Sequence, residues 1–305
     1  MKIALVGLDL VGTSLGLALK AASDAFEIVG HDPDEERVKR ARKLKAVDRT
    51  HWNLISACEG AELVLLDLPY GELDKTFASL SQGLEGSPVI IDTTAVKRPV
   101  MQLAEQHLQA FCFVGGHVTA PAITAQAKPS ADLFADGVFY LVATPGLSSA
   151  ALDVASNLVV AIGARPHFID AREHEGLVAA MLPLPLLGNL AILRALGAEA
   201  GAYDRSQLAA AQPGLLGELP SSESIVQSRA IHFATVRWLD ACDRELQVLR
   251  QTLAAGDPRV LRGMVERSLE QWQSWLSGPE EEEPVERPRI WRNLFLGNLG
   301  RSDHK

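Results

Sequence analysis

The sequence predicts an α/β protein: a mostly parallel sheet domain over residues 1–170, followed by an all-helical domain over residues 171–276. Strand-like apolar runs alternate with helix-like segments as far as residue 170. Beyond that point apolar residues recur only at helical spacing, over Glu175–Leu196, Ser224–Thr252 and Pro258–Leu276. An acidic stretch broken by prolines then predicts a solvated linker and tail over residues 277–305.

The first 32 residues predict a strand, a tight turn, a helix and a second strand. Lys2–Val6 is a short apolar run that ends at Gly7, and Gly12–Ala22 has helical spacing without proline. A second run, Phe26–Gly30, leads to Asp32 about 20 residues after the turn, where a dinucleotide site needs an acid for the ribose. The order of these elements is that of a Rossmann-type βαβ unit.

The turn itself is the candidate binding site for a diphosphate. Gly7 permits the tight reversal, Gly12 allows the helix to pack close to the strand, and the free N–H groups at the helix start attract anions. Asp9 stands where the middle glycine of the G-x-G-x-x-G pattern is expected, so it adds bulk and like charge. The candidate cofactor-binding residues here are Gly7, Leu8, Asp9, Leu10, Val11, Gly12 and Asp32.

Further strands extend the predicted sheet. They are expected over Ala61–Leu68, Ser87–Ile91, Phe111–Val114, Val138–Ala143 and Arg165–Ile169, with helices over Pro33–Leu44 and Ser149–Ile162. Ligands bind at the carboxyl ends of parallel strands. The segments Gly7–Gly12, Leu68–Tyr70 and Asp92–Lys97 are therefore expected to line one crevice with Asp32, which adds Leu68, Pro69 and Thr93 to the cofactor contacts.

Composition excludes several classes of protein. The net charge of −9 and the lack of a basic stripe argue against nucleic-acid binding. No secretory signal and no apolar run of membrane-spanning length is apparent, and Cys58, Cys112 and Cys242 fit reduced packing residues, so a cytoplasmic protein without a membrane contact is expected. No HExxH or paired-cysteine pattern predicts a metal, and no G-x-S-x-G predicts a hydrolase. The apolar helical region predicts a homodimer.

Several motifs, in order, resemble those of the prephenate/arogenate dehydrogenases. They are GLDLVGTSLGLAL with Asp32, the strand-end Pro69, DTTAVK at Asp92–Lys97, GGHVTAP at Gly115–Pro121, ADLF at Ala131–Phe134 and HEGLVAA at His174–Ala180. The resemblance implies a Rossmann domain for NAD or NADP and a helical domain that forms the dimer and much of the substrate site. It implies oxidative decarboxylation of prephenate or arogenate in tyrosine biosynthesis, with an anionic hydroxy acid as substrate.

The resemblance assigns roles residue by residue. His117 matches the histidine that accepts the substrate hydroxyl proton, and Lys97 matches the family lysine. Ala95 replaces the family serine, so Thr94 or Thr93 is the candidate hydroxyl. The second histidine is missing from Leu182–Leu186, and the arginine is missing from Gly214–Pro220. Candidate replacement cations are Lys97, Lys128, Arg205 and Arg229.

The first interpretation is an NAD-dependent oxidoreductase with His117 as proton acceptor, in which Asp32 favours NAD over NADP. One alternative is a related β-hydroxyacid-type dehydrogenase with Lys97 as acid and base. Another is a catalytically silent NAD-binding sensor or partner protein. The pair His174-Glu175 is expected to cap a helix at the domain junction, and His232 is expected to be structural.

Overall fold

A computed structural model describes the chain except for residues 125, 145, 200, 202–230 and 278–305. The predicted linker and tail after Ser277 and the first part of the expected helix Ser224–Thr252 lie outside the described residues. The chain divides into two compact units. Met1–Val178 belong to the first, and the helices that follow Ala179 belong to the second.

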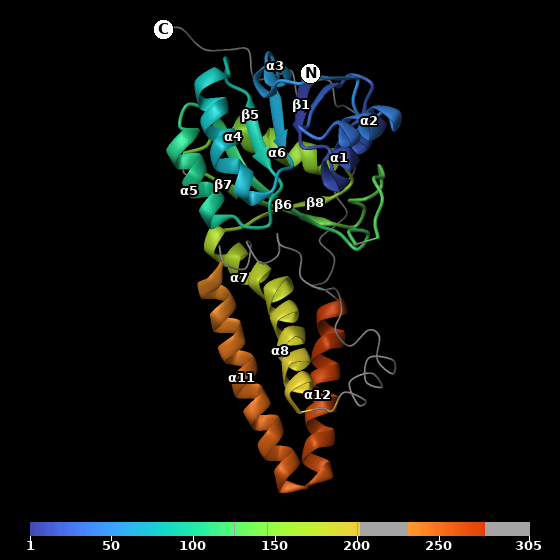
Figure 1. Cartoon of the computed structure of the whole chain (residues 1–305), viewed down its shortest axis with the longest axis vertical. Helices are drawn as coiled ribbons and strands as arrows, with labels where there is room; N and C mark the ends of the chain where they lie inside the picture. The colour runs from blue at the N-terminus through green and yellow to red at the C-terminus, as the bar shows by residue number, and fades with distance from the viewer. Residues whose placement is uncertain (125, 145, 200, 202–230, 278–305) are drawn as a thin grey trace. The chain divides into compact units, whose positions relative to one another are not determined.

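The first unit is built on one eight-stranded sheet with the order β3-β2-β1-β4-β5-β6-β7-β8 (Figure 1). Every neighbouring pair is parallel except β6 and β7. The predicted α/β class with a mostly parallel sheet is therefore confirmed. The strands are β1 (Lys2–Val6), β2 (Glu27–His31), β3 (Arg49–Thr50), β4 (Leu63–Leu66), β5 (Val89–Asp92), β6 (Cys112–Thr119), β7 (Val138–Ala143) and β8 (Arg165–Phe168).

Helices connect these strands and cover both faces of the sheet. They are α1 (Leu10–Ala22), α2 (Glu35–Lys43), α3 (Leu54–Cys58), α4 (Tyr70–Gly83), α5 (Arg98–His107) and α6 (Ser149–Ala161), followed by α7 (Ala171–Met181). The strand expected over Ala61–Leu68 ends at Leu66 in the structure, and α4 begins at Tyr70, directly after its N-cap residue Pro69.

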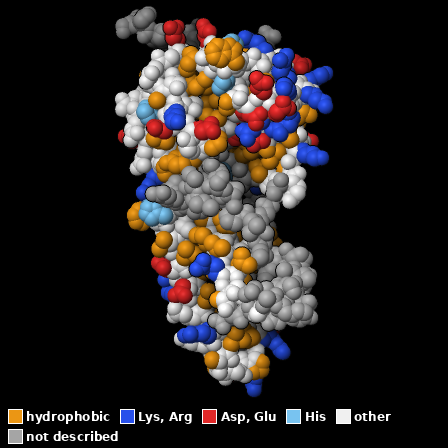
Figure 2. All heavy atoms as spheres, in the orientation of Figure 1, with side chains coloured by type: hydrophobic (Ala, Val, Ile, Leu, Met, Phe, Trp, Pro, Cys, Tyr) orange, Lys and Arg blue, Asp and Glu red, His pale blue; other side chains and the backbone are white. Residues whose placement is uncertain are grey.

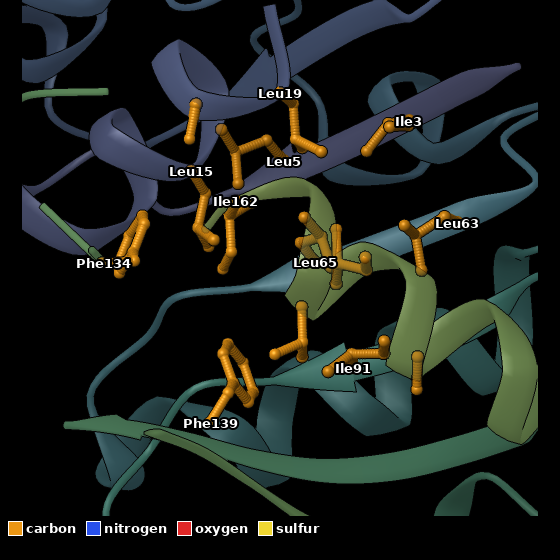
Figure 3. Packing of buried hydrophobic residues seen from close by; sticks show 14 of the residues in the cluster. Ile3, Leu5, Leu15, Leu19, Leu63, Leu65, Ile91, Phe134, Phe139 and Ile162 are labelled. Carbon is orange, nitrogen blue, oxygen red and sulfur yellow. The ribbon is translucent and has the colours of Figure 1, made fainter. Parts of the chain in front are cut away.

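The core follows from the alternation of side chains along the buried strands. Ile3 and Leu5 of β1 belong to one cluster with residues of β4, β5, α1 and α6 (Figure 3). On the other face Phe77 of α4 packs edge to face against Phe113 of β6, with ring centroids 5.3 Å apart. Since both faces are covered, the central strands are apolar throughout, and their carboxyl ends remain the places for polar chemistry.

Strand β6 is longer than the sequence predicted, and this changes the place of His117. The expected strand ended at Val114, but β6 continues to Thr119 and pairs His117 with Tyr140 of the antiparallel β7. Gly116 makes the continuation possible because a Cβ there would lie 2.4 Å from the carbonyl oxygen of Asp92. His117 therefore lies inside the sheet and not in a loop after it.

The second unit contains α8 (Pro183–Glu199), α11 (His232–Ala255) and α12 (Pro258–Ser277), and α11 packs against both α8 and α12. All its described regular structure is helical, as the sequence predicted. These helices expose many large apolar side chains, among them Phe233, Leu246, Leu253, Leu269, Trp272, Trp275 and Leu276.

Two expectations from composition need correction. The stretch Ala171–Ala198 is a helical segment of 28 residues that contains an 18-residue window with a mean hydropathy of 2.0, so by length and composition alone it could cross a membrane. One such segment is weak evidence for a span, because helices that pack in protein interiors pass the same test. Of the cysteines only Cys58 is buried, where burial raises its pKa to about 12, whereas Cys242 is exposed and fills no core.

Candidate functional site

The turn between β1 and α1 has the close backbone packing that its glycines predicted. Gly7 has φ +93°, and a Cβ there would lie 1.9 Å from the carbonyl oxygen of Asp67. A Cβ on Gly12 would lie 2.0 Å from the carbonyl oxygen of Gly7. Both positions accept only glycine without movement of the backbone, so strand, turn and helix form one rigid element.

Asp32, at the end of β2, faces this turn. Its Oδ2 accepts the N–H of Leu8 at 2.7 Å, and its Oδ1 accepts the N–H of Asp34 at 2.8 Å. Each carboxylate oxygen retains a second lone pair that a ribose hydroxyl can use. This is the geometry expected of the acid that holds the adenosine ribose of a dinucleotide.

Asp9 does not turn toward the N–H groups at the helix start. It is the N-cap residue of α1, yet its side chain makes no capping hydrogen bond. Its two oxygens pair instead with Arg37 at 3.2 Å and with Arg40 at 3.1 Å, both on α2. The basic residues of α2 that follow its two acidic residues are a sequence signal for this contact, and Figure 2 shows acidic and basic side chains intermixed over this part of the surface.

A second acid, which sequence reasoning missed, lies against the start of α1. Asp67 follows β4 directly, and its Oδ2 accepts the N–H of Gly12 at 2.6 Å. Its Oδ1 accepts the hydroxyl of Thr93, at the end of β5, at 2.6 Å. The next residues, Leu68 and Pro69, are partly buried and exposed respectively. The contacts of Asp67 thus connect the ends of β4 and β5 to the glycine turn.

A buried ion pair lies beside the end of β5. Lys97 and Asp92 are both fully buried and form a salt bridge, and the hydroxyl of Thr94 donates to the same Asp92 oxygen. The other oxygen of Asp92 accepts the N–H of Gly116 at 3.0 Å. The Lys97 ammonium and the Thr94 hydroxyl are therefore both bonded to Asp92. Because Lys97 is fully buried, the expectation from the sequence that it lines an open crevice is wrong.

His117 is brought together with a histidine from the start of α7. Its Nδ1 lies 3.1 Å from Nε2 of His174, and the two rings are perpendicular. The ring of Tyr140 packs against both histidines. Nδ1 of His174 is buried and has no hydrogen-bond partner among the described residues. The sequence did not predict this pair, because its members are 57 positions apart.

Burial keeps both imidazoles neutral. Burial, followed by the neighbouring His174 and the charge of Lys97, holds the pKa of His117 well below its usual value. Burial, followed by the charge of Lys97, lowers the pKa of His174 to about 3. Since both rings are neutral at physiological pH, one N–H joins them, and a proton on Nδ1 of His117 leaves its Nε2 free as an acceptor.

The expected capping role of His174-Glu175 is wrong. Asp170 caps α7, because its Oδ1 accepts the N–H of Arg172 at 2.8 Å. Glu175 is buried and pairs with Arg98 at 3.5 Å. His232 begins α11, and its ring lies tilted against that of Phe233 with the ring centroids 4.0 Å apart.

The remaining candidate residues lie elsewhere or outside the described chain. Lys128 is exposed, and Arg205, Arg229 and the segment Gly214–Pro220 are outside the described residues. The segment Leu182–Leu186 belongs to the second unit. Among the described residues no group of three or more His, Cys, Asp or Glu could hold a metal.

The rigid glycine turn, the acid at the end of β2 and the crossed strand order define the first unit as a Rossmann-type nucleotide-binding domain. Residues 15–167, half of the chain, match the family model described as prephenate dehydrogenase, nucleotide-binding domain. The chain therefore belongs to the prephenate dehydrogenase family, whose members are dehydrogenases. The match begins after the glycine turn.

Curated relatives agree with this assignment. The chain is 29% identical over 192 residues to prephenate dehydrogenase of Bacillus subtilis (strain 168), covering 60% of this chain and 50% of the relative. It is 28% identical over 186 residues to cyclohexadienyl dehydrogenase of Zymomonas mobilis, covering 60% and 63%. The matched part of the chain spans less than two thirds of the length of these relatives.

Solved structures share the fold. Synechocystis arogenate dehydrogenase has a TM-score of 0.76 at 20% identity and covers 90% of this chain and 100% of its own. Prephenate dehydrogenase from Aquifex aeolicus, in complex with hydroxyphenyl propionate and NAD+, has a TM-score of 0.76 at 15% identity, with coverage of 90% and 98%. At these identities the likeness concerns the fold.

Proposed function

We propose that this chain is an NAD-dependent dehydrogenase that oxidises and decarboxylates prephenate or arogenate, with His117 as the proton acceptor. The observation that carries the proposal is the neutral histidine pair, because it leaves one nitrogen of His117 free in a domain of this family. The names of the relatives support both substrates.

The residues present fit a dinucleotide at the adenosine end. Asp32 has free lone pairs for a ribose, and its charge disfavours the 2′-phosphate of NADP. The N–H groups of Leu10 and Val11, in the first turn of α1, have no partner within the helix and suit diphosphate oxygens. The bound nicotinamide would supply the hydride acceptor.

His117 would act on the substrate hydroxyl. With its Nδ1 proton bonded to His174, Nε2 is the nitrogen of His117 that would accept the proton of the substrate hydroxyl. The buried pair Lys97 and Asp92 holds the strand end beside Gly116, the residue before His117. Thr94 and Lys97, matched to the family site, are thus positioning residues in this proposal.

A thermal-shift titration with NAD, NADH and NADP tests the cofactor. NAD or NADH at a hundred times its dissociation constant should stabilise the protein by about 2.7 kcal/mol, with NADP weaker. Prephenate and arogenate are then assayed by NADH formation. His117→Asn should abolish turnover and keep NADH binding, whereas the matched surface variant His107→Asn should retain both.

The same experiment distinguishes the proposed function from two alternatives. A β-hydroxyacid-type dehydrogenase would use Lys97 as acid and base, but its burial and its pairing with Asp92 favour a positioning role. A silent NAD-binding sensor is favoured by Ala95 and by the two threonine hydroxyls that bond to acids. NADH binding without turnover of either substrate would support these alternatives.

The helical region over residues 171–276, which comprises α7 and the helices of the second unit, is proposed as the dimerisation and substrate domain. The exposed apolar side chains of α11 and α12 support a homodimer, since a second copy would bury them. Light scattering after size exclusion should give twice the mass of one chain. A cytoplasmic location remains part of this proposal.

A further inference from the structure

The carboxylate of Asp67 accepts a hydrogen bond from a backbone N–H group at the start of α1. Its Oδ2 accepts from Gly12 at 2.6 Å, and the hydroxyl of Thr93 fixes its other oxygen. The main-chain N–H of Asp67 donates to the carbonyl of Val6 at 2.7 Å, so the residue is tied to β1 as well. This acid is thus held firmly at the positive end of the helix.

The proposed cofactor needs the same end of α1. The diphosphate of a dinucleotide is bound by N–H groups of the first helical turn and by the helix dipole. Leu10 and Val11 offer such groups, but the neighbouring group, on Gly12, already bonds to a carboxylate. A diphosphate placed there meets a like charge at short range in a partly dehydrated site, where Coulomb repulsion is strong.

We propose that Asp67 is an internal anion that competes with the dinucleotide diphosphate for the start of α1 and so limits cofactor affinity. The inference rests on the proposed function, because it concerns the cofactor of that site. It assigns the limiting role to Asp67 and not to Asp9, whose charge is paired with Arg37 and Arg40 on the outer side of the turn.

The charge of Asp67 makes this competition depend on pH. The pKa of the Asp67 carboxyl is raised, chiefly by burial and to a smaller extent by the charge of Asp9. The hydrogen bonds from Thr93 and Gly12 and the charge of Arg37 act in the opposite direction. A diphosphate would raise this pKa further, because the protonated acid no longer repels it. Binding then takes up a proton at Asp67, and affinity falls as pH rises above the pKa of the free protein, by at most about tenfold per pH unit.

The test compares the full chain with Asp67→Asn, which keeps the shape and removes the charge. ADP-ribose and NADH are titrated by calorimetry between about pH 5 and about pH 8, in buffers of different ionisation enthalpy, to count protons. The matched control is Asp24→Asn, an exposed acid beyond the other end of α1. We expect Asp67→Asn to bind both ligands at least about tenfold more tightly at the upper pH and to lose the proton uptake, with Asp24→Asn unchanged from the wild type.

Equal affinity of wild type and Asp67→Asn at every pH, with NADH bound by both, would overturn this inference and leave the proposed function intact. If neither protein binds NADH or ADP-ribose, the proposed function fails and this inference fails with it. Binding by Asp67→Asn alone would support the inference strongly.

A measurement on the wild type keeps the test decisive if Asp67→Asn does not fold. Adenosine lacks the diphosphate but shares the adenosine part of ADP-ribose, so the ratio of ADP-ribose affinity to adenosine affinity isolates the effect of the anion. The diphosphate keeps its charge over this range. The ratio should fall as pH rises, and a constant ratio would overturn the inference.

Discussion

Nδ1 of His117 lies 3.1 Å from Nε2 of His174, and this contact joins the middle of β6 to the first turns of α7. Both rings are buried and neutral, so they share a single proton between the facing nitrogens. Whichever ring donates decides which nitrogen of His117 is left as an acceptor. His174 is therefore the residue that sets the tautomer of the proposed base.

Removal of His174 tests this role directly. His174→Phe should lower kcat by at least about tenfold, because His117 loses the partner that fixes its tautomer. His174→Gln, whose amide oxygen can accept from Nδ1 of His117, should restore much of the activity. Steady-state assays with the better of the two proposed substrates measure both. Equal loss in the two variants would indicate a merely structural role.

The pH profile gives a second readout of the same pair. Because the pKa of His117 is held well below its usual value, it remains a base in mild acid, and the acidic limb of kcat/KM should lie below pH 6.5. His174→Phe removes one of the groups that lower this pKa, so the limb should move toward neutral pH. An acidic limb above pH 6.5 in the wild type would contradict the assignment.

Stability should also depend on pH through His174. Its pKa is about 3 in the folded protein and about 6.5 when unfolded, so the unfolded chain binds more protons between these values. The free energy of unfolding should fall by about 1.4 kcal/mol per pH unit as pH decreases from 6.5, and this part of the slope should vanish in His174→Phe. Urea denaturation at several pH values measures it, with His107→Phe as the surface control.

The local pattern of the sequence was enough for most of the strands, although β3, α3, α4 and α5 were not predicted from it, and the order of the predicted elements was enough for the fold class. The predicted strand Lys2–Val6 is β1 and the predicted Val138–Ala143 is β7, because buried strands are short apolar runs with clear ends. Gly7 and Gly12 were correctly placed at a close approach. Strand β6 was predicted too short, because two glycines read locally as a turn, whereas pairing with β7 keeps them extended.

The polar contacts were harder to predict, since they join residues far apart in the chain. Asp67 and Gly12 are 55 positions apart, and only the packed sheet brings them together. A signal existed, because an acid directly after a buried strand points into the crevice at the carboxyl ends. For His174, the acid at Asp170 with Glu173 three residues later marks the helix start and leaves the histidine for another role.

Because Lys97 and Asp92 form a buried ion pair, replacing one of the two should greatly lower the free energy of unfolding. Lys97→Met leaves Asp92 charged and buried, so the free energy of unfolding should fall by about 3–5 kcal/mol. The matched surface change Lys39→Met removes an exposed pair with Glu36, which water screens, so it should change the free energy of unfolding far less than Lys97→Met. Chemical denaturation compares them, and a loss below 1 kcal/mol in Lys97→Met would show that Asp92 is not held as an ion.

Adding a side chain at Gly116 should disturb the packing of the sheet and lower its stability. A Cβ at this position would lie 2.4 Å from the carbonyl oxygen of Asp92 and 2.6 Å from the ring of Phe139, and neither can move without shifting β5 or β7. Gly116→Ala should therefore lower the free energy of unfolding by about 1–3 kcal/mol or more. It should also lower turnover, because the next residue is His117.

The matched glycine is Gly71, near the start of α4, where a Cβ meets no atom within 4 Å. Gly71→Ala should raise stability by about 0.4–1 kcal/mol, because alanine loses less backbone entropy on folding. Thermal melts of the wild type and the two variants measure both effects: the melting temperature should fall in Gly116→Ala and rise in Gly71→Ala. A stable Gly116→Ala protein with full turnover would mean that β6 and β5 lie farther apart than this packing requires.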